Sequence, residues 1–171
     1  MRRSAKKILA LSVAAIGAMA IASVVNFSPR FVWNASASAP IGLYQIEDRA
    51  PQLGDFLLVK PDPELEKLIA ARGYLPEGVP LLKRVAALAG DKICRKSEAI
   101  FINGTYVAEA GIFDSAGRKL PHWSSCFVLG KHELFLLNDH EKSLDGRYFG
   151  ATKSDHLIGV AIPLWTKESE G

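Results

Sequence analysis

Short apolar runs of β type, separated by turn residues, fill most of the chain after residue 40 and limit the folds that it can adopt. We expect strands at Gly42–Glu47, Asp55–Pro61, Leu81–Leu88, Glu133–Asn138 and Leu157–Trp165. We also expect a hairpin at Ala99–Glu109, because Asn103-Gly104 is the favoured two-residue turn between alternating strands. The segment "GRKLPHWSSC" has a loop-like composition. These patterns predict a mainly β domain.

Only one segment of this region has a helix pattern. Asp62 is a good N-cap, Pro63 suits the first helical position, and Gly73 ends the apolar body "ELEKLIAAR". One short helix among many short strands favours a coiled β-sheet or barrel-like domain.

A basic end and an uncharged run precede the β-rich part. Arg2, Arg3, Lys6 and Lys7 come before Ile8–Val25, whose 18 uncharged residues would span roughly 27 Å as a helix. The run is rich in alanine, so a cleaved signal peptide is an alternative to a membrane anchor. A buried soluble helix is disfavoured because the run has no polar stripe. We therefore expect an N-terminal membrane helix or signal segment.

This pattern divides the chain into a basic end with a membrane or signal segment, 1–25, and an exported domain, 26–171. The basic end stays in the cytoplasm and the rest crosses the membrane. The net charge is +3, and the four basic residues contribute +4, which leaves the exported part near −1. We therefore expect no nucleic-acid partner.

The chain has two cysteines, Cys94 and Cys126. In an exported domain we expect them to form a disulfide. A zinc site would need His122 and His132 as well, but the chain has neither a C-x-x-C nor an H-x-x-x-H pair. We expect no metal.

The stretch "NASASAP" can be interpreted as a cleavage site or as part of an active site. Its small-x-small pattern lies about 12 residues beyond Val25, farther than a cleavage site usually lies from its apolar run. Cutting after Ala39 would place Pro40 just past the bond, where proline hinders strand-like docking. Ser36 and Ser38 are instead candidate nucleophiles.

A serine nucleophile needs a base, which is a histidine or a lysine. His140 lies in a polar segment, but the chain has no G-x-S-x-G elbow. A lysine base must be buried, and Lys83 lies in the apolar strand "LLKRVAAL" with Arg84 on the opposite face. The alternative is that both side chains extend to water.

The segment "SLDGRYFG" contains groups that could support such a lysine. Ser143 and Asp145 would position an ammonium group, and Arg147 would pair with Asp145. A simple loop salt bridge is the alternative. A calcium loop is disfavoured because, counted from Glu141, its twelfth position is Thr152 instead of glutamate.

Three segments in this order behind a membrane segment, "SASAPIGLY", "LLKRVAALAGD" and "SLDGRYFG", resemble the signal peptidase I superfamily of Ser/Lys peptidases, family S26. More narrowly, the chain is similar to the TraF-type conjugative transfer signal peptidases, which mature pilin precursors. That similarity rests on "S-x-P-x-G-L-Y", on "RGYLPEG" ahead of "LLKRV", and on "GRKLPHW" with a following cysteine. The chain also lacks the large insertion of general leader peptidases. The resemblance extends from Asn34 to about Leu164.

The resemblance implies a role for each matching residue. Ser38 matches the nucleophile and Lys83 the general base. The Ser36 hydroxyl matches an oxyanion donor, with the backbone N–H of Ser38 as the other donor. Asp145 matches the acidic residue reported as catalytic in the TraF type.

Ser143 matches a serine that orients the lysine, and Arg147 matches the partner of the aspartate. Gly146 departs from the commoner serine at its position, which puts no catalytic residue in doubt.

The implied protein is a membrane-associated serine endopeptidase that needs no cofactor and cleaves after small residues in a pilin or related precursor. It would lie in the bacterial inner membrane with its catalytic domain in the periplasm, or be periplasmic if residues 1–25 are removed. Its partners would be the precursor, the membrane and other conjugative transfer proteins. The alternatives are a general type I signal peptidase, a self-cleaving repressor and a non-catalytic assembly component. The membrane segment argues against a repressor, and the presence of both Ser38 and Lys83 argues against an inactive component.

Overall fold

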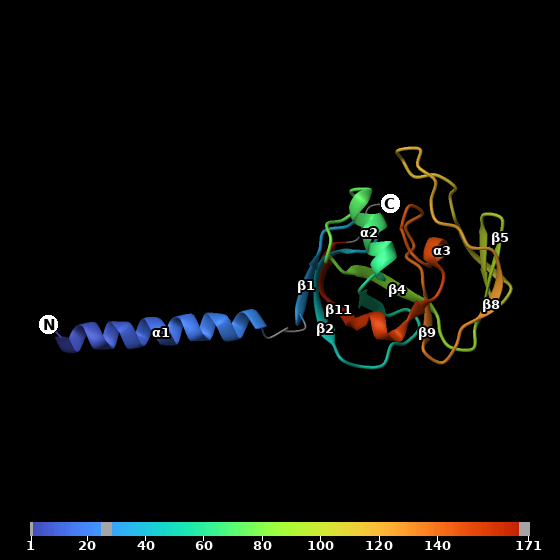
Figure 1. The fold of residues 1–171 in the computed structure, drawn as a ribbon. Helices are drawn as coiled ribbons and strands as arrows, with labels where there is room; N and C mark the ends of the chain where they lie inside the picture. The colour runs from blue at the N-terminus through green and yellow to red at the C-terminus, as the bar shows by residue number, and fades with distance from the viewer. Residues whose placement is uncertain (1, 25–28, 168–171) are drawn as a thin grey trace.

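The computed structural model describes residues 2–24 and 29–167, and its strands form two antiparallel sheets (Figure 1). The seven-stranded sheet has the order β1-β2-β11-β3-β4-β9-β10. Its strands are β1 (Phe31–Asn34), β2 (Ile41–Glu47), β11 (Leu157–Lys167), β3 (Phe56–Val59), β4 (Leu81–Ala87), β9 (Glu133–Leu136) and β10 (Thr152–Lys153). The mainly β fold with a curled sheet confirms the predicted fold class.

A smaller sheet lies beside the end of the large one that carries β9 (Figure 1). Its order is β7-β6-β5-β8. Its strands are β5 (Lys92–Lys96), β6 (Ala99–Ile102), β7 (Thr105–Glu109) and β8 (Ser125–Val128). The Asn103-Gly104 turn joins β6 to β7, as the hairpin pattern predicts.

The helices are α1 (Arg2–Val24), α2 (Pro63–Ala71), the short α3 (Gly146–Phe149) and the 3-10 turn η1 (Ser154–His156). Figure 1 shows α1 apart from both sheets. None of the helices in the described ranges combines the length and the mean hydropathy of a membrane span.

The predicted helix is α2, and its start follows from its cap. The Asp62 side chain accepts hydrogen bonds from the backbone N–H groups of Glu64 and Leu65, which have no partner within the helix. The helix ends at Ala71 with Arg72 as its C-cap, and Gly73 follows with a φ of +70°, a conformation that favours glycine.

Sequence patterns found the longer strands and missed several short elements. The missed elements are β1, β5, β8, β10, α3 and η1. The segment predicted as a loop, "GRKLPHWSSC", is in fact strand at Ser125 and Cys126. These two residues form a strand because they pair with Arg95 and Cys94 on β5. The sequence has no alternation of apolar and polar residues there that would predict a strand.

The core lies between the sheets and under α2. One cluster joins α2 to β3, β4, β9 and β11, and another fills the space between β5, β6, β9 and α3. These two clusters enclose the middle of β4 and the segment before α3. Both regions carry predicted site residues.

Candidate functional site

Lys83 lies in the middle of β4, between β3 and β9 in the large sheet. The residue is only 4% exposed, whereas the side chain of the next residue, Arg84, is 43% exposed and pairs with Asp139 at 3.0 Å. The predicted opposite orientation of the two neighbours is confirmed. The alternative in which both side chains extend to water is wrong.

Among the described residues, the tip of the Lys83 side chain has one hydrogen-bond partner. Its Nζ donates to Ser143 Oγ at 2.9 Å, and Ser143 is itself buried. Burial lowers the pKa of Lys83 from 10.5 to about 8, the negative charge of Asp145 opposes this shift, and the positive charge of Arg147 adds to it. A substantial fraction of Lys83 is therefore neutral at mildly alkaline pH and able to accept a proton.

Asp145 lies close enough to act on Lys83 through its charge, but it is bound to other groups. Its carboxylate accepts hydrogen bonds from the backbone and the guanidinium of Arg147, with Nε at 2.9 Å, and from the backbone N–H of Asn138. Arg147 and Asp145 are both almost completely buried. In the described part of the chain Asp145 makes no hydrogen bond to Lys83.

Asn138 connects the segment before α3 to the lysine strand. Its Oδ1 accepts from the backbone N–H of Arg84 at 2.8 Å, and its Nδ2 donates to the carbonyl of Leu82 at 3.2 Å. These two bonds flank Lys83 along β4. Sequence reasoning assigned no role to Asn138, although an asparagine at the end of an apolar strand is a recognisable signal for a side chain that bonds to backbone.

Ser36 and Ser38 lie in the loop between β1 and β2. Their Oγ atoms are 3.0 Å apart, and the backbone N–H of Ser38 points to Ser36 Oγ at 3.4 Å. Asn34 holds this loop: its Nδ2 lies 2.9–3.1 Å from the carbonyl oxygens of Ser36, Ala39 and Pro40. The Asn34 Oδ1 also accepts from the backbone N–H of Ser36 at 3.0 Å. Sequence reasoning missed this role of Asn34.

The serine loop and the lysine strand meet through an apolar cluster. Ala39, which follows Ser38, and Leu82, which precedes Lys83, belong to one buried cluster. No hydrogen bond joins the two described side chains of Ser38 and Lys83. The described structure therefore brings the serine loop against the lysine strand without joining these two side chains.

In the described residues neither the alternative base, His140, nor a set of metal ligands comes together with partners that would form a site. His140 is exposed, and its Nδ1 accepts from the backbone N–H of Lys142 instead of from a serine. Within residues 2–24 and 29–167 no group of three or more metal-ligating side chains comes together. Cys94 and Cys126, which the sequence paired, are joined by a disulfide between β5 and β8.

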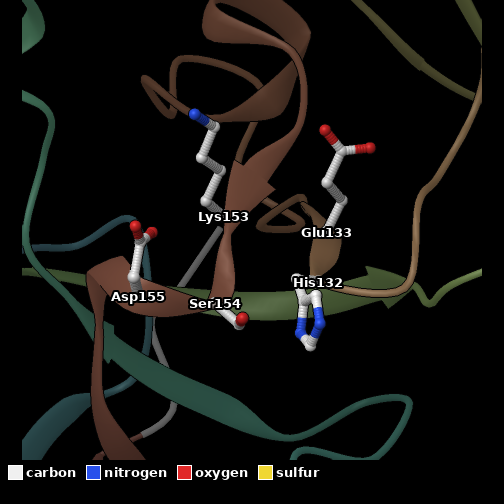
Figure 2. Close-up of a pocket in the computed structure, with 5 residues that line it drawn as sticks. All are labelled: His132, Glu133, Lys153, Ser154 and Asp155. Atoms are coloured by element: carbon white, nitrogen blue, oxygen red, sulfur yellow. The ribbon is translucent and has the colours of Figure 1, made fainter.

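A surface pocket lies elsewhere, where β9, β10 and η1 meet (Figure 2). The residues that line it, drawn in Figure 2, are His132, Glu133, Lys153, Ser154 and Asp155. None of them is a predicted site residue.

The chain is similar to several known proteins. The family model described as signal peptidase, peptidase S26, matches residues 5–165. Plasmid transfer protein TraF of Escherichia coli is 30% identical over 145 residues, which cover 78% of this chain and 81% of that protein. Conjugal transfer protein TraF of Agrobacterium tumefaciens (strain 15955) is 32% identical over 143 residues, with the same coverage of 78% and 81%. A signal peptidase I crystal structure from Enterococcus faecalis aligns with a TM-score of 0.39 at 23% identity, covering 67% of this chain and 98% of that one.

Proposed function

Because the chain belongs to the signal peptidase family, peptidase S26, we propose that it is a serine endopeptidase with Ser38 as nucleophile and Lys83 as general base. The observation that carries this proposal is the buried Lys83, whose Nζ is bound to Ser143 and whose pKa is lowered to about 8. A lysine in this environment has the property that the reaction needs, a neutral amine near physiological pH.

In the proposed reaction the neutral Lys83 Nζ takes the proton of Ser38 Oγ while that oxygen attacks the carbonyl carbon of the scissile peptide bond. The proton then passes to the leaving amine as the peptide C–N bond breaks, and an ester links Ser38 to the first part of the substrate. Water, deprotonated by Lys83, hydrolyses this ester and restores the enzyme.

The oxyanion of the tetrahedral intermediate would bind the Ser38 N–H and the Ser36 hydroxyl. One such donor is worth about 3–4 kcal/mol in other enzymes. In the structure these two groups face each other, because the Ser38 N–H points to Ser36 Oγ at 3.4 Å. A long bond of this kind is weak, so we expect substrate to replace it at little cost.

We assign Ser143, Asp145 and Arg147 to the support of Lys83. Ser143 orients the amine, and Asp145 anchors the segment through its ion pair with Arg147. All the hydrogen bonds of the Asp145 carboxylate in the described structure go to Arg147 and Asn138. We therefore propose that the aspartate acts through position and charge, without transferring a proton.

We propose that the substrate is a pilin or related precursor of a conjugative transfer system, cut after small residues. The support is the similarity to two proteins named TraF, together with the sequence segments "RGYLPEG" and "GRKLPHW". The precursor, the membrane and other transfer proteins would be the partners. The basic end and uncharged run of residues 1–25, together with the disulfide, support attachment to the inner membrane with the catalytic domain in the periplasm.

The test is to replace Ser38 and Lys83 by alanine separately in the full chain, purified in detergent micelles. The probe is an internally quenched peptide with alanine at the first and third positions before the bond, and maturation of the co-expressed pilin precursor provides a second measure. Ser115→Ala and Lys131→Ala, at exposed positions, are the matched controls. We expect both site variants to lose cleavage and both controls to retain it. Unchanged cleavage in the two site variants would exclude the Ser/Lys mechanism.

A further inference from the structure

Arg95 is a buried cation that the proposed reaction does not use. It lies on β5 of the small sheet, is 4% exposed, and forms no ion pair with a carboxylate in the part of the chain that the structure describes. Its guanidinium donates to the carbonyl of Ser97 at 2.9 Å and to the carbonyl of Arg147 at 2.8 Å. Burying a charged side chain without a carboxylate partner is costly, so the burial of Arg95 needs an explanation.

Trp123 makes a second contact with the same short helix. Its Nε1 donates to the carbonyl of Gly146 at 2.9 Å, and its ring packs edge-on against Phe127 and Phe135. Gly146 itself has no room for a side chain: a Cβ there would lie 2.7 Å from the carbonyl oxygen of Leu136 and 2.8 Å from the Phe135 ring. Helix α3 is therefore closely packed against β9 and bonded to Trp123.

A third contact completes the attachment. The hydroxyl of Tyr148 accepts a hydrogen bond from the backbone N–H of Gly111, at 3.1 Å. Three successive residues of α3 are thus hydrogen-bonded to the small sheet and to the loop 110–124 between its strands β7 and β8. The disulfide joins the strands on both sides of this attachment, because Cys94 precedes Arg95 and Cys126 lies three residues after Trp123.

The loop 110–124 is also hydrogen-bonded to the segment that follows α2. The Asp114 carboxylate accepts hydrogen bonds from the Tyr74 hydroxyl and from Arg118 Nε, and Arg118 Nη1 donates to the carbonyl of Arg72. These residues belong to the segments around "RGYLPEG" and "GRKLPHW", to which the reaction assigns no role. The two segments together tie the loop to the end of α2.

We propose that Arg95 and Trp123 are positioning residues for the Lys83 base. They hold α3, and with it Ser143 and Asp145, at a fixed distance from β4. The proposal rests on the function proposed above, because it assumes that the state of Lys83 matters for cleavage. The small sheet and its loop 110–124 thus hold α3 and the residues just before it, which surround the amine of Lys83.

A positioning role for Arg95 and Trp123 predicts a change in the pKa of Lys83 that a purely structural role does not predict. The charged groups that act on Lys83 are Asp145 and Arg147, and Ser143 is its neutral partner. Loosening α3 would let water reach Lys83, and since burial is the main cause of its low pKa, that pKa would rise. A general loss of stability would lower the folded fraction and leave the pKa of the folded protein unchanged.

The experiment follows the ¹³Cε resonance of Lys83 against pH in the full chain, labelled with ¹³C-lysine, held in detergent micelles and assigned with Lys83→Met. The variants are Arg95→Met, Arg95→Lys and Trp123→Phe, of which the last keeps an aromatic ring at this position and removes the N–H donor. The controls are Lys96→Met, next to Arg95 on β5 but exposed, and Tyr106→Phe on β7. Cleavage of the quenched peptide is measured on the same samples.

We expect the pKa of Lys83 to rise by about one unit in Arg95→Met and by less in the other two variants. A rise of one unit lowers the neutral fraction, and hence cleavage below pH 8, about tenfold, and the loss should disappear above pH 10. If Arg95→Met does not fold, the Lys83 titrations of Arg95→Lys and Trp123→Phe test the inference. An unchanged Lys83 titration in the folded variants would overturn the inference. The titration does not depend on cleavage, so persistent cleavage by Ser38→Ala would overturn the proposed function separately.

Discussion

The two halves of the candidate site are stabilised in different ways. Lys83 is buried, and charged and polar side chains from a distant part of the chain surround it. Ser36 is exposed and Ser38 is half-buried. Their loop is held by Asn34, which bonds mainly to backbone carbonyls, and by the Tyr44 hydroxyl, which donates to the carbonyl of Pro40. The proposed base therefore depends on tertiary packing, whereas the proposed nucleophile depends on a local loop.

This difference fits the demands of each group. A lysine acts as a base near neutral pH only where burial disfavours its charged form, and such burial needs a rigid surround. A serine nucleophile must instead meet an extended substrate, so it has to remain accessible. We therefore expect changes near Lys83 to alter stability and pH dependence, and changes near Ser38 to alter turnover.

The largest effect is expected from Lys83→Arg. Arginine keeps its proton at any pH at which the protein is folded, so it cannot accept the proton of Ser38. We expect kcat/KM for the quenched peptide to fall on the order of 10³-fold or more. Arg84→Lys, at the exposed neighbour, should leave kcat/KM essentially unchanged. A Lys83→Arg enzyme with near-normal activity would show that Lys83 is not the base.

Asp145→Asn tests the buried surroundings of Lys83 by its effect on the stability of the protein. The change leaves the Arg147 guanidinium buried without its ion-pair partner, and we expect the free energy of unfolding to fall by about 3–5 kcal/mol. Asp139→Asn, which removes the exposed partner of Arg84, should cost about 1 kcal/mol or less. Urea denaturation of both variants measures the difference. Equal effects would contradict the contrast between the buried and the exposed ion pair.

Asn34→Ala tests the serine loop. Loss of the amide removes the groups that hold the carbonyls of Ser36, Ala39 and Pro40, and we expect kcat/KM to fall about 10- to 100-fold through misplacement of Ser38. The free energy of unfolding should fall by only about 1–2 kcal/mol. The apparent pKa of the activity profile should stay at its wild-type value, and a shift of that pKa would mean that the loop also controls Lys83.

The last prediction concerns the pH dependence of stability. Between pH 8 and 10.5 the unfolded chain binds a proton at Lys83 that the folded protein has released, so the free energy of unfolding rises with pH by up to about 1.4 kcal/mol per unit. Below pH 8 the cost of burying the charged amine is fully present, and above 10.5 it is absent. We therefore expect Lys83→Met to be more stable than the wild type below pH 8, with a gap that narrows toward pH 10.5. A gap independent of pH would refute the lowered pKa.

Patterns within single elements predicted much of the fold. The caps of α2, the hairpin turn between β6 and β7, and the opposite orientation of Lys83 and Arg84 all follow from neighbours along the chain. The elements that were missed depend on partners instead. Strand β8 exists through its pairing with β5, and α3 is a four-residue turn held by Asp145 and the small sheet.

The candidate site divides along the same line. Residue patterns singled out Ser38, Lys83 and Asp145 as candidates, and the resemblance to a family gave each of them a role. Neither identified the roles of Asn34, Asn138, Arg95 and Trp123, whose side chains bond to backbone groups. Backbone contacts of this kind become visible only when the segments are brought together.

The sequence by itself determined the local properties of this protein: which runs form strands, where α2 begins, and which face of β4 carries the lysine. Only the tertiary structure decided how deeply that lysine is buried and which of its predicted neighbours it bonds to. Ser143 lies 60 residues away in the sequence, and its contact with Lys83 depends on the pairing of β4 with β9 and on the seating of α3. The physical reason is that strand and helix preferences are set by near neighbours, whereas burial and pKa are set by every segment that excludes water from a site.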